Sequence, residues 1–162
     1  MSREDDQEIR ELDEMIGNAA SMEPLDARRS FLELVVRALR EPVVAAAGEL
    51  ERTGRLTTGE LLLLTEHLFA TVTLVGLPSK HDAFSADTKD IRIRVIPRHR
   101  IASIELETVG WHERSPYTIA EGLPSEAEVT LVLMAPDERI EVGGRPAALD
   151  RFYETVLRGL IA

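Results

Sequence analysis

The stretch Ile91–Glu107 constrains the fold of this chain more than any other. Apolar residues alternate with Arg92 and Arg94 in its first half and with Glu105 and Glu107 in its second half. A period of two residues is typical of a strand with one buried face. A short connection containing a proline separates the halves, so we predict two strands of one hairpin with arginines opposite glutamates. The chain is therefore expected to be built on antiparallel sheet.

Further strands are predicted on both sides of this stretch. Glu60–Thr65 and His67–Val75 are rich in Leu, Val and Thr, which favours strands. Residues 129–142 alternate on both sides of Pro136-Asp137, a pair that suits the centre of a type I turn. The segment 43–52 fits a first strand or a helix, with a slight preference for the strand. The predicted core contains the following residues: Leu62, Leu64, Leu68, Val72, Ile91, Ile93, Ile104, Leu106, Leu131, Ile140, Phe152, Val156 and Leu160.

Helices are predicted at both ends of the chain. Apolar residues recur at helical spacing over Leu149–Ile161, which indicates one apolar face. A narrow apolar stripe lies on a very acidic segment near the N-terminus, and a second helix is predicted at about Leu25–Arg40. The second helix is apolar over more than half of its circumference, so we expect it to be buried on two sides. Its candidate association surface consists of Phe31, Leu32, Val35, Val36 and Leu39.

Composition and charge exclude several classes of partner. A chain of 162 residues has room for one full core. Its formal net charge of −10 argues against nucleic-acid partners and against more than peripheral contact with an anionic membrane. The chain contains no cysteine, its start lacks the apolar core of a signal peptide, and no apolar run is long enough to span a bilayer. We therefore expect a cytoplasmic protein.

Several local segments of the chain carry a resemblance to a known family. They are Gly59–Thr65, Ile96-Pro97, the start of the next strand at Ile101–Glu105, and the terminal helix at Leu149–Leu160. Together they resemble the PH-like barrel of bacterial PH and GRAM-type domains. The resemblance covers residues 42–162 and implies an α+β fold of about seven antiparallel strands in two near-orthogonal sheets, capped by a C-terminal amphipathic helix. Residues 1–41 would form a preceding pair of helices. The family implies binding or scaffolding and no shared chemistry.

The sequence contains no pattern that indicates catalysis. Its four histidines lack the paired spacing of a metal site, and no serine lies in a nucleophile elbow. Phosphate-binding glycine loops are also absent. We therefore predict neither an enzyme, nor a cofactor, nor a metal.

One basic cluster in this acidic chain is a candidate anion-binding site. It consists of Lys89, Arg92, Arg94, Arg98 and Arg100. Some PH-like proteins hold anionic lipid head groups with basic strand and loop residues. The competing interpretation is that the arginines pair with Glu105 and Glu107 on the neighbouring strand.

These observations favour a non-catalytic protein-interaction or scaffolding module that self-associates, with a homodimer as the default symmetry. Peripheral binding of an anionic lipid or a phosphorylated ligand through the residues from Arg92 to Arg100 is the alternative. A small acidic chaperone of the secretion type is a further alternative.

Overall fold

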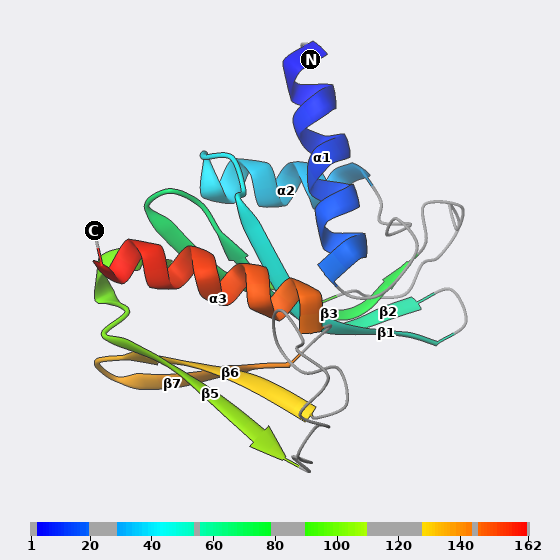
Figure 1. Ribbon diagram of the computed structural model, residues 1–162. Helices are drawn as coiled ribbons and strands as arrows, with labels where there is room; N and C mark the ends of the chain where they lie inside the picture. The colour runs from blue at the N-terminus through cyan, green and yellow to red at the C-terminus, as the bar shows by residue number, and fades with distance from the viewer. Residues whose placement is uncertain are drawn as a thin grey trace, which may run out of the picture.

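Most strands and helices predicted from the residue patterns are formed. A computed structural model describes residues 3–19, 29–53, 56–78, 90–109, 128–143 and 146–161. Within these ranges the chain folds into three α-helices and two antiparallel sheets, which confirms the predicted α+β class (Figure 1).

The first sheet has four strands in the order β1-β2-β3-β4, and each strand is antiparallel to its neighbour. The strands are β1 (Ala45–Thr53), β2 (Leu56–Leu64), β3 (Leu68–Pro78) and β4 (Asp90–Pro97). The second sheet has the order β5-β6-β7. Its strands are β5 (Ser103–Val109), β6 (Glu128–Ala135) and β7 (Glu138–Val142). Residues 45–53 are therefore a strand, as was slightly preferred, and the hairpin that turns at Pro136-Asp137 is confirmed.

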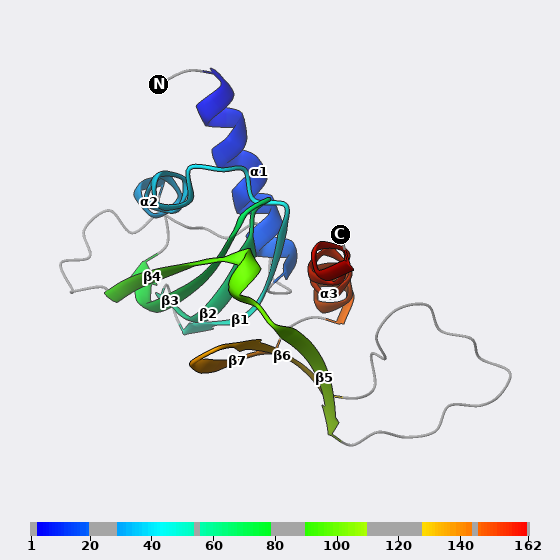
Figure 2. The same ribbon diagram turned by 90° about the vertical axis from the view of Figure 1, so that its left-hand side faces the viewer.

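The prediction that β4 and β5 form a hairpin is wrong. β4 pairs along its length with β3, and β5 pairs with β6 in the other sheet. The 3-10 turn η1 (Arg98–Arg100) lies between them, and the buried Ile96 and Ile101 on its two sides fix the crossing. Figure 2 shows the chain passing from β4 in the upper sheet to β5 in the lower one. Alternation gave the two strands correctly, but it carries no information about which strand pairs with which.

Residues 61–64 of β2 are buried on both faces of the first sheet, which explains the unbroken apolar run. Leu61 and Leu63 belong to the core cluster beneath the N-terminal helices, whereas Leu62 and Leu64 belong to the cluster shared with the second sheet. All four are at most 3% exposed. A strand with two buried faces is apolar at every position rather than at every second one.

The backbones of β1 and β2 approach closely where two glycines lie. Gly48 is opposite Leu61, and Gly59 is opposite Leu50. A Cβ on Gly48 would lie 2.9 Å from the Cα of Leu61, and a Cβ on Gly59 would lie 2.9 Å from the Cα of Leu50. A Cβ at either position would also collide with a carbonyl oxygen of the facing strand. Larger residues would therefore force these two strands apart.

The N-terminal helices α1 (Arg3–Ala19) and α2 (Arg29–Leu39) cover one face of the first sheet. The first turns of α1 project beyond α2, while its later turns pack beside β1 (Figure 1). The apolar side chains of both helices share one core cluster with those of the sheet. Residues 3–19 and 29–39 thus have no core separate from that of the sheet.

The C-terminal helix α3 (Pro146–Ile161) packs between the two sheets, beside β1 (Figure 2). Leu149, Phe152 and Val156 recur on its buried face and join Phe69 of β3 and Leu133 of β6 in the second core cluster. Within the described ranges no hydrogen-bonded ladder joins the two sheets, so the predicted closed barrel is not formed. The sheets are held together by side-chain packing and by α3.

The predicted core is largely correct. Leu62, Leu64, Val72, Phe152 and Val156 are buried. Four further residues are half-buried against the core: Ile91, Ile93, Ile104 and Ile140. Leu68 is half-buried as well, and the side chains of Leu131 and Leu160 lie outside the described part of the structure.

The prediction is wrong for Leu106, which is 39% exposed because it lies on an edge strand. Among the described residues, no helix is long and apolar enough to cross a membrane.

Candidate functional site

The arginines of β4 lie on the face that is directed toward the second sheet. Pairing with β3 places Arg94 opposite Thr71 and Arg92 opposite Thr73. Both arginines are exposed and both threonines are half-buried. Phe69, Thr71 and Thr73 alternate with residues of β3 that face the helices, so these three face the second sheet. This alternation is the signal in the sequence for the arrangement. Two guanidinium groups and two hydroxyls thus gather on one part of the sheet.

An ion pair between Arg94 and Glu138 joins the two sheets on the side away from α3. On the other face of the second sheet, Arg139 donates to Glu107 at 2.6 Å and to Glu141 at 2.9 Å. The hydrogen bonds to Glu107 and Glu141 raise the pKa of Arg139 above its ordinary value. The positive charge of Arg139 is therefore met within its own sheet.

A polar cleft opens between the first sheet and β7, and we call it the inter-sheet cleft. Its volume is about 230 Å³. The carboxylates of Glu60 and Glu138, the guanidinium group of Arg94 and two threonine hydroxyls lie along it, so its chemistry suits a small polar or charged group. The cleft is lined by Glu60, Leu61, Leu62, Thr71, Thr73, Arg94, Glu138, Arg139, Ile140 and Glu141.

The predicted anion-binding cluster does not gather at one place. Only Arg92 and Arg94 lie together, because Arg98 and Arg100 belong to η1, beyond the end of β4. Arg98 donates to the carbonyl oxygens of Thr65 at 2.8 Å and Thr155 at 3.1 Å, so it ties the β2–β3 turn to α3. Arg100 is exposed, and Lys89 lies outside the described residues.

The predicted pairing of Arg92 and Arg94 with Glu105 and Glu107 on a neighbouring strand is also wrong. The two glutamates lie on β5, in the other sheet. Arg94 and Glu107 each have a different partner, as described above. Arg92 and Glu105 are exposed and form no ion pair with another described residue.

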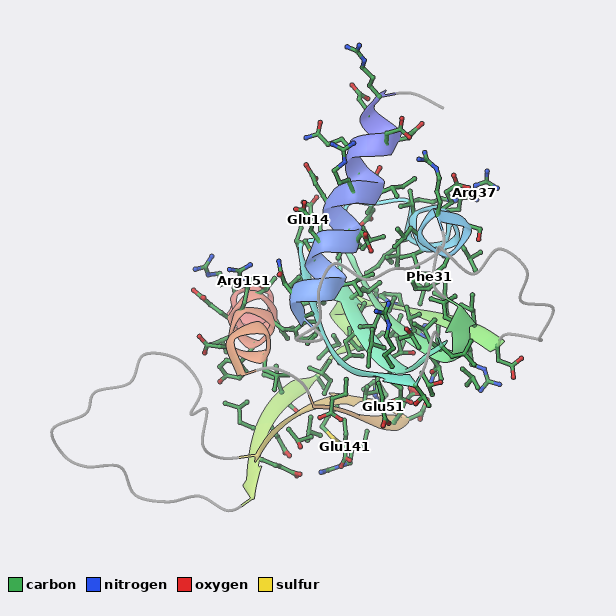
Figure 3. All side chains as sticks on the ribbon, turned by 90° about the vertical axis from the view of Figure 1, so that its right-hand side faces the viewer. Glu14, Phe31, Arg37, Glu51, Glu141 and Arg151 are labelled. Carbon is green, nitrogen blue, oxygen red and sulfur yellow. The ribbon has the colours of Figure 1, made fainter. Side chains whose placement is uncertain are left out.

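The candidate association surface of α2 faces the interior of the same chain. Phe31, Leu32, Val35 and Leu39 are at most 4% exposed, and Val36 is partly buried against them. Figure 3 shows Phe31 pointing from α2 toward the sheet and Arg37 pointing away from it. The apolar area that suggested a second chain is therefore covered in cis.

A hydrogen-bonded group at the β2–β3 turn has no signal in the sequence. The hydroxyl of the buried Thr65 donates to Glu41 at 2.6 Å and accepts from the backbone N–H of Leu68 at 2.9 Å. The N–H of His67 also donates to Glu41, at 3.2 Å. The hydroxyl of Thr65 is the main reason that the pKa of Glu41 lies below its ordinary value. This group anchors the segment that enters the first sheet.

The described side chains form no cluster that could hold a metal ion, because no three histidine or carboxylate groups among them lie close enough together. His67 contacts Glu41, His99 is exposed on η1, and His81 and His112 lie outside the described residues.

Two consecutive strands lie at sheet edges. β4 ends the first sheet and β5 ends the second, and no described strand pairs with the open side of either. Each carries an exposed branched apolar residue, Val95 at 37% and Leu106 at 39%. The other edge strands are β1, which has α1 and α3 packed beside it, and β7, while α2 packs beside β4 and α3 beside β5. Open sides of this kind are where a further strand can add to a sheet.

Comparisons with known proteins give no relative. No protein-family model, no curated protein and no solved structure matches this chain.

Proposed function

We propose that this chain is a non-catalytic protein-interaction module with a PH-like framework, and that it associates with itself. The order of its elements supports the framework, because four strands of one sheet, three of another and a terminal helix between them follow one another along the chain. The sheets do not close into a barrel by hydrogen bonds. The resemblance to the PH-like barrel is therefore limited to the order of the elements and their arrangement in layers.

The observation that carries the proposal is the pair of open edge strands. Proteins usually protect an edge by covering it, shortening it, bending it or placing charged residues or proline on it, and β4 and β5 do carry charges at alternate positions. β4 has eight residues and β5 has seven, and both keep exposed apolar side chains beside their open backbone groups. Strand addition uses main-chain hydrogen bonds for affinity and alternate side chains for specificity. We therefore assign to these two strands the self-association that the sequence analysis predicted for α2.

Sedimentation equilibrium of the full chain tests the proposal. We expect the weight-average mass to rise from 18.0 kDa toward twice that value as the concentration increases. Concentrations up to about 1 mM make even a weak association visible. A mass that stays at 18.0 kDa over the whole range would contradict self-association.

Anionic ligand binding is the second candidate, and the placement of Arg92 and Arg94 beside Thr71 and Thr73 favours it. A phosphate group could accept from both kinds of side chain. Because Arg94 already pairs with Glu138, we expect the affinity to be low and to fall with salt. Co-sedimentation with vesicles of anionic and of neutral lipid, with Arg92→Ala/Arg94→Ala as the comparison, tests this. Tight binding that the double variant loses would make this the main function.

A further inference from the structure

We propose that the open edge of β4 pairs with the open edge of β5 from a second copy of the chain. This inference rests on the proposed self-association and assigns its surface. Each copy has one strand of each kind, so the β4 edge of one copy can pair with the β5 edge of another. Backbone hydrogen-bonding direction and side-chain charge lead to this pairing separately.

The hydrogen-bonding direction of β4 follows from its end. The N–H of Arg98 donates to the carbonyl of His67 at 2.8 Å, directly after the pairing of Pro97 with Leu68. Hydrogen-bonded and non-hydrogen-bonded pairs alternate along an antiparallel ladder. Arg92, Arg94 and Ile96 therefore bond to β3, and the backbone groups of the odd-numbered residues point to the open side. These open positions are Ile91, Ile93 and Val95, and Pro97 fits the same series because it has no N–H to donate.

The direction of β5 follows from the β6–β7 hairpin. Pro136-Asp137 is a two-residue turn, so Ala135 and Glu138 close it as a hydrogen-bonded pair. Odd-numbered residues of β6 therefore bond to β7, and even-numbered residues bond to β5. Because Val132 lies opposite Glu105, the glutamates of β5 bond to β6. The backbone groups of Ile104 and Leu106 point to the open side.

Pairing the two open edges brings compatible side chains together. Antiparallel strands must match their open positions, and the alignment that places Val95 opposite Ile104 also places Ile93 opposite Leu106. The positions between them then match Arg94 with Glu105, and Arg92 with Glu107. Apolar residues meet apolar residues, and each arginine meets a glutamate.

Like strands cannot pair in this way. Two copies of β4 would set arginine opposite arginine, and two copies of β5 would set glutamate opposite glutamate, both of which are repulsive. The charge pattern therefore disfavours pairing between two copies of β4 or two copies of β5, and it favours pairing of β4 with β5. Arg92 and Glu105 form no ion pair with a described residue of their own chain, whereas their partners in this alignment, Glu107 and Arg94, also pair with Arg139 and Glu138.

Charge reversal and its rescue test the inference. We expect Arg92→Glu alone and Glu107→Arg alone to weaken self-association by about tenfold or more, since each sets like charges together. An equimolar mixture of the two variants should regain association, because the reversed strands match each other. Arg100→Glu makes the same charge change at an exposed position outside both strands and should have no effect.

A backbone variant gives a second, independent measurement. Val95→Pro removes an N–H from the open edge and leaves the bonds to β3 in place, so it should abolish association, whereas Val95→Thr should keep it. Circular dichroism and thermal melting show whether each variant is folded. Undiminished association of the folded variants would overturn the β4–β5 pairing and leave the proposed function standing. A wild-type chain that stays monomeric would overturn both.

Discussion

At the scale of the residue, the hydroxyl of Thr65 is the best-defined polar contact. It is fully buried, donates to Glu41 and accepts from the N–H of Leu68. Thr65→Val keeps the shape but removes both hydrogen bonds, so we expect the free energy of unfolding to fall by about 1–3 kcal/mol. Urea unfolding measures this. Thr73→Val, at a half-buried position of the same sheet, is the control and should change stability by less than about 0.5 kcal/mol.

The carboxyl group of Glu41 should make stability depend on pH. Its pKa is lowered from 4.5 in the folded state, chiefly by the hydroxyl of Thr65. A lowered folded pKa means that the contribution is complete above pH 4.5 and is lost as the pH falls through the folded value. We expect Glu41→Gln to be less stable than the parent at pH 7, with the difference shrinking at acidic pH. A difference that stays constant from pH 7 to the acid limit of folding would contradict this assignment.

Arg40 ends α2 in an unfavourable backbone conformation. Its φ is 58°, and its N–H donates to the carbonyl of Val36 at 2.9 Å. A left-handed conformation costs an L-residue roughly 1–2 kcal/mol, and glycine adopts it freely but loses more entropy on folding. We therefore expect Arg40→Gly to stabilise the protein by about 0.5–1 kcal/mol in thermal unfolding. Arg37→Gly, inside the same helix, should destabilise it by about 1 kcal/mol.

At the scale of the element, α3 stabilises the contact between the two sheets. Phe152 is fully buried among residues of both sheets. Phe152→Asp would bury an unpaired charge, which costs several kcal/mol, so we expect unfolded or insoluble protein. Arg151→Asp introduces the same residue one position earlier, where the side chain points away from the molecule (Figure 3). Wild-type melting of the Phe152→Asp variant would exclude α3 from the core.

The strands and helices were easier to predict from the sequence than the contacts between them. Alternation identified β4 and β5, and helical spacing identified the buried face of α3, because both periods follow from local geometry. The pairing of β4 with β3, the covering of α2 by the sheet and the contact of Arg98 with Thr155 join residues far apart in the chain. No local pattern encodes such contacts, so the candidate site could be predicted only as far as Arg92 and Arg94.

At the scale of the whole molecule, the helices at residues 3–19 and 29–39 are part of the packing. Their removal would uncover Leu61, Leu63, Val72 and Leu74 on one face of the sheet, all of which are buried in the same cluster as the helices. We expect the truncated chain to be insoluble or unfolded, rather than the soluble lower-order form that a separate helical pair would leave. Expression and circular dichroism measure this. Removing only residues 1–7, of which residues 3–7 are exposed, should leave a folded protein.

The unbroken apolar run of β2 also bears on how the chain reaches its fold. A strand that alternates is penalised when it slips by one position, because its apolar side turns to water. A slip of Leu61–Leu64 by one position would put one leucine in the place of another. Slipped alignments of this segment are therefore nearly equal in energy to the native alignment while the chain collapses. Gly48 and Gly59 remove this degeneracy, since in a slipped alignment a side chain would collide with the facing carbonyl. We therefore expect the two glycines to favour the native alignment of β1 and β2 as the chain folds.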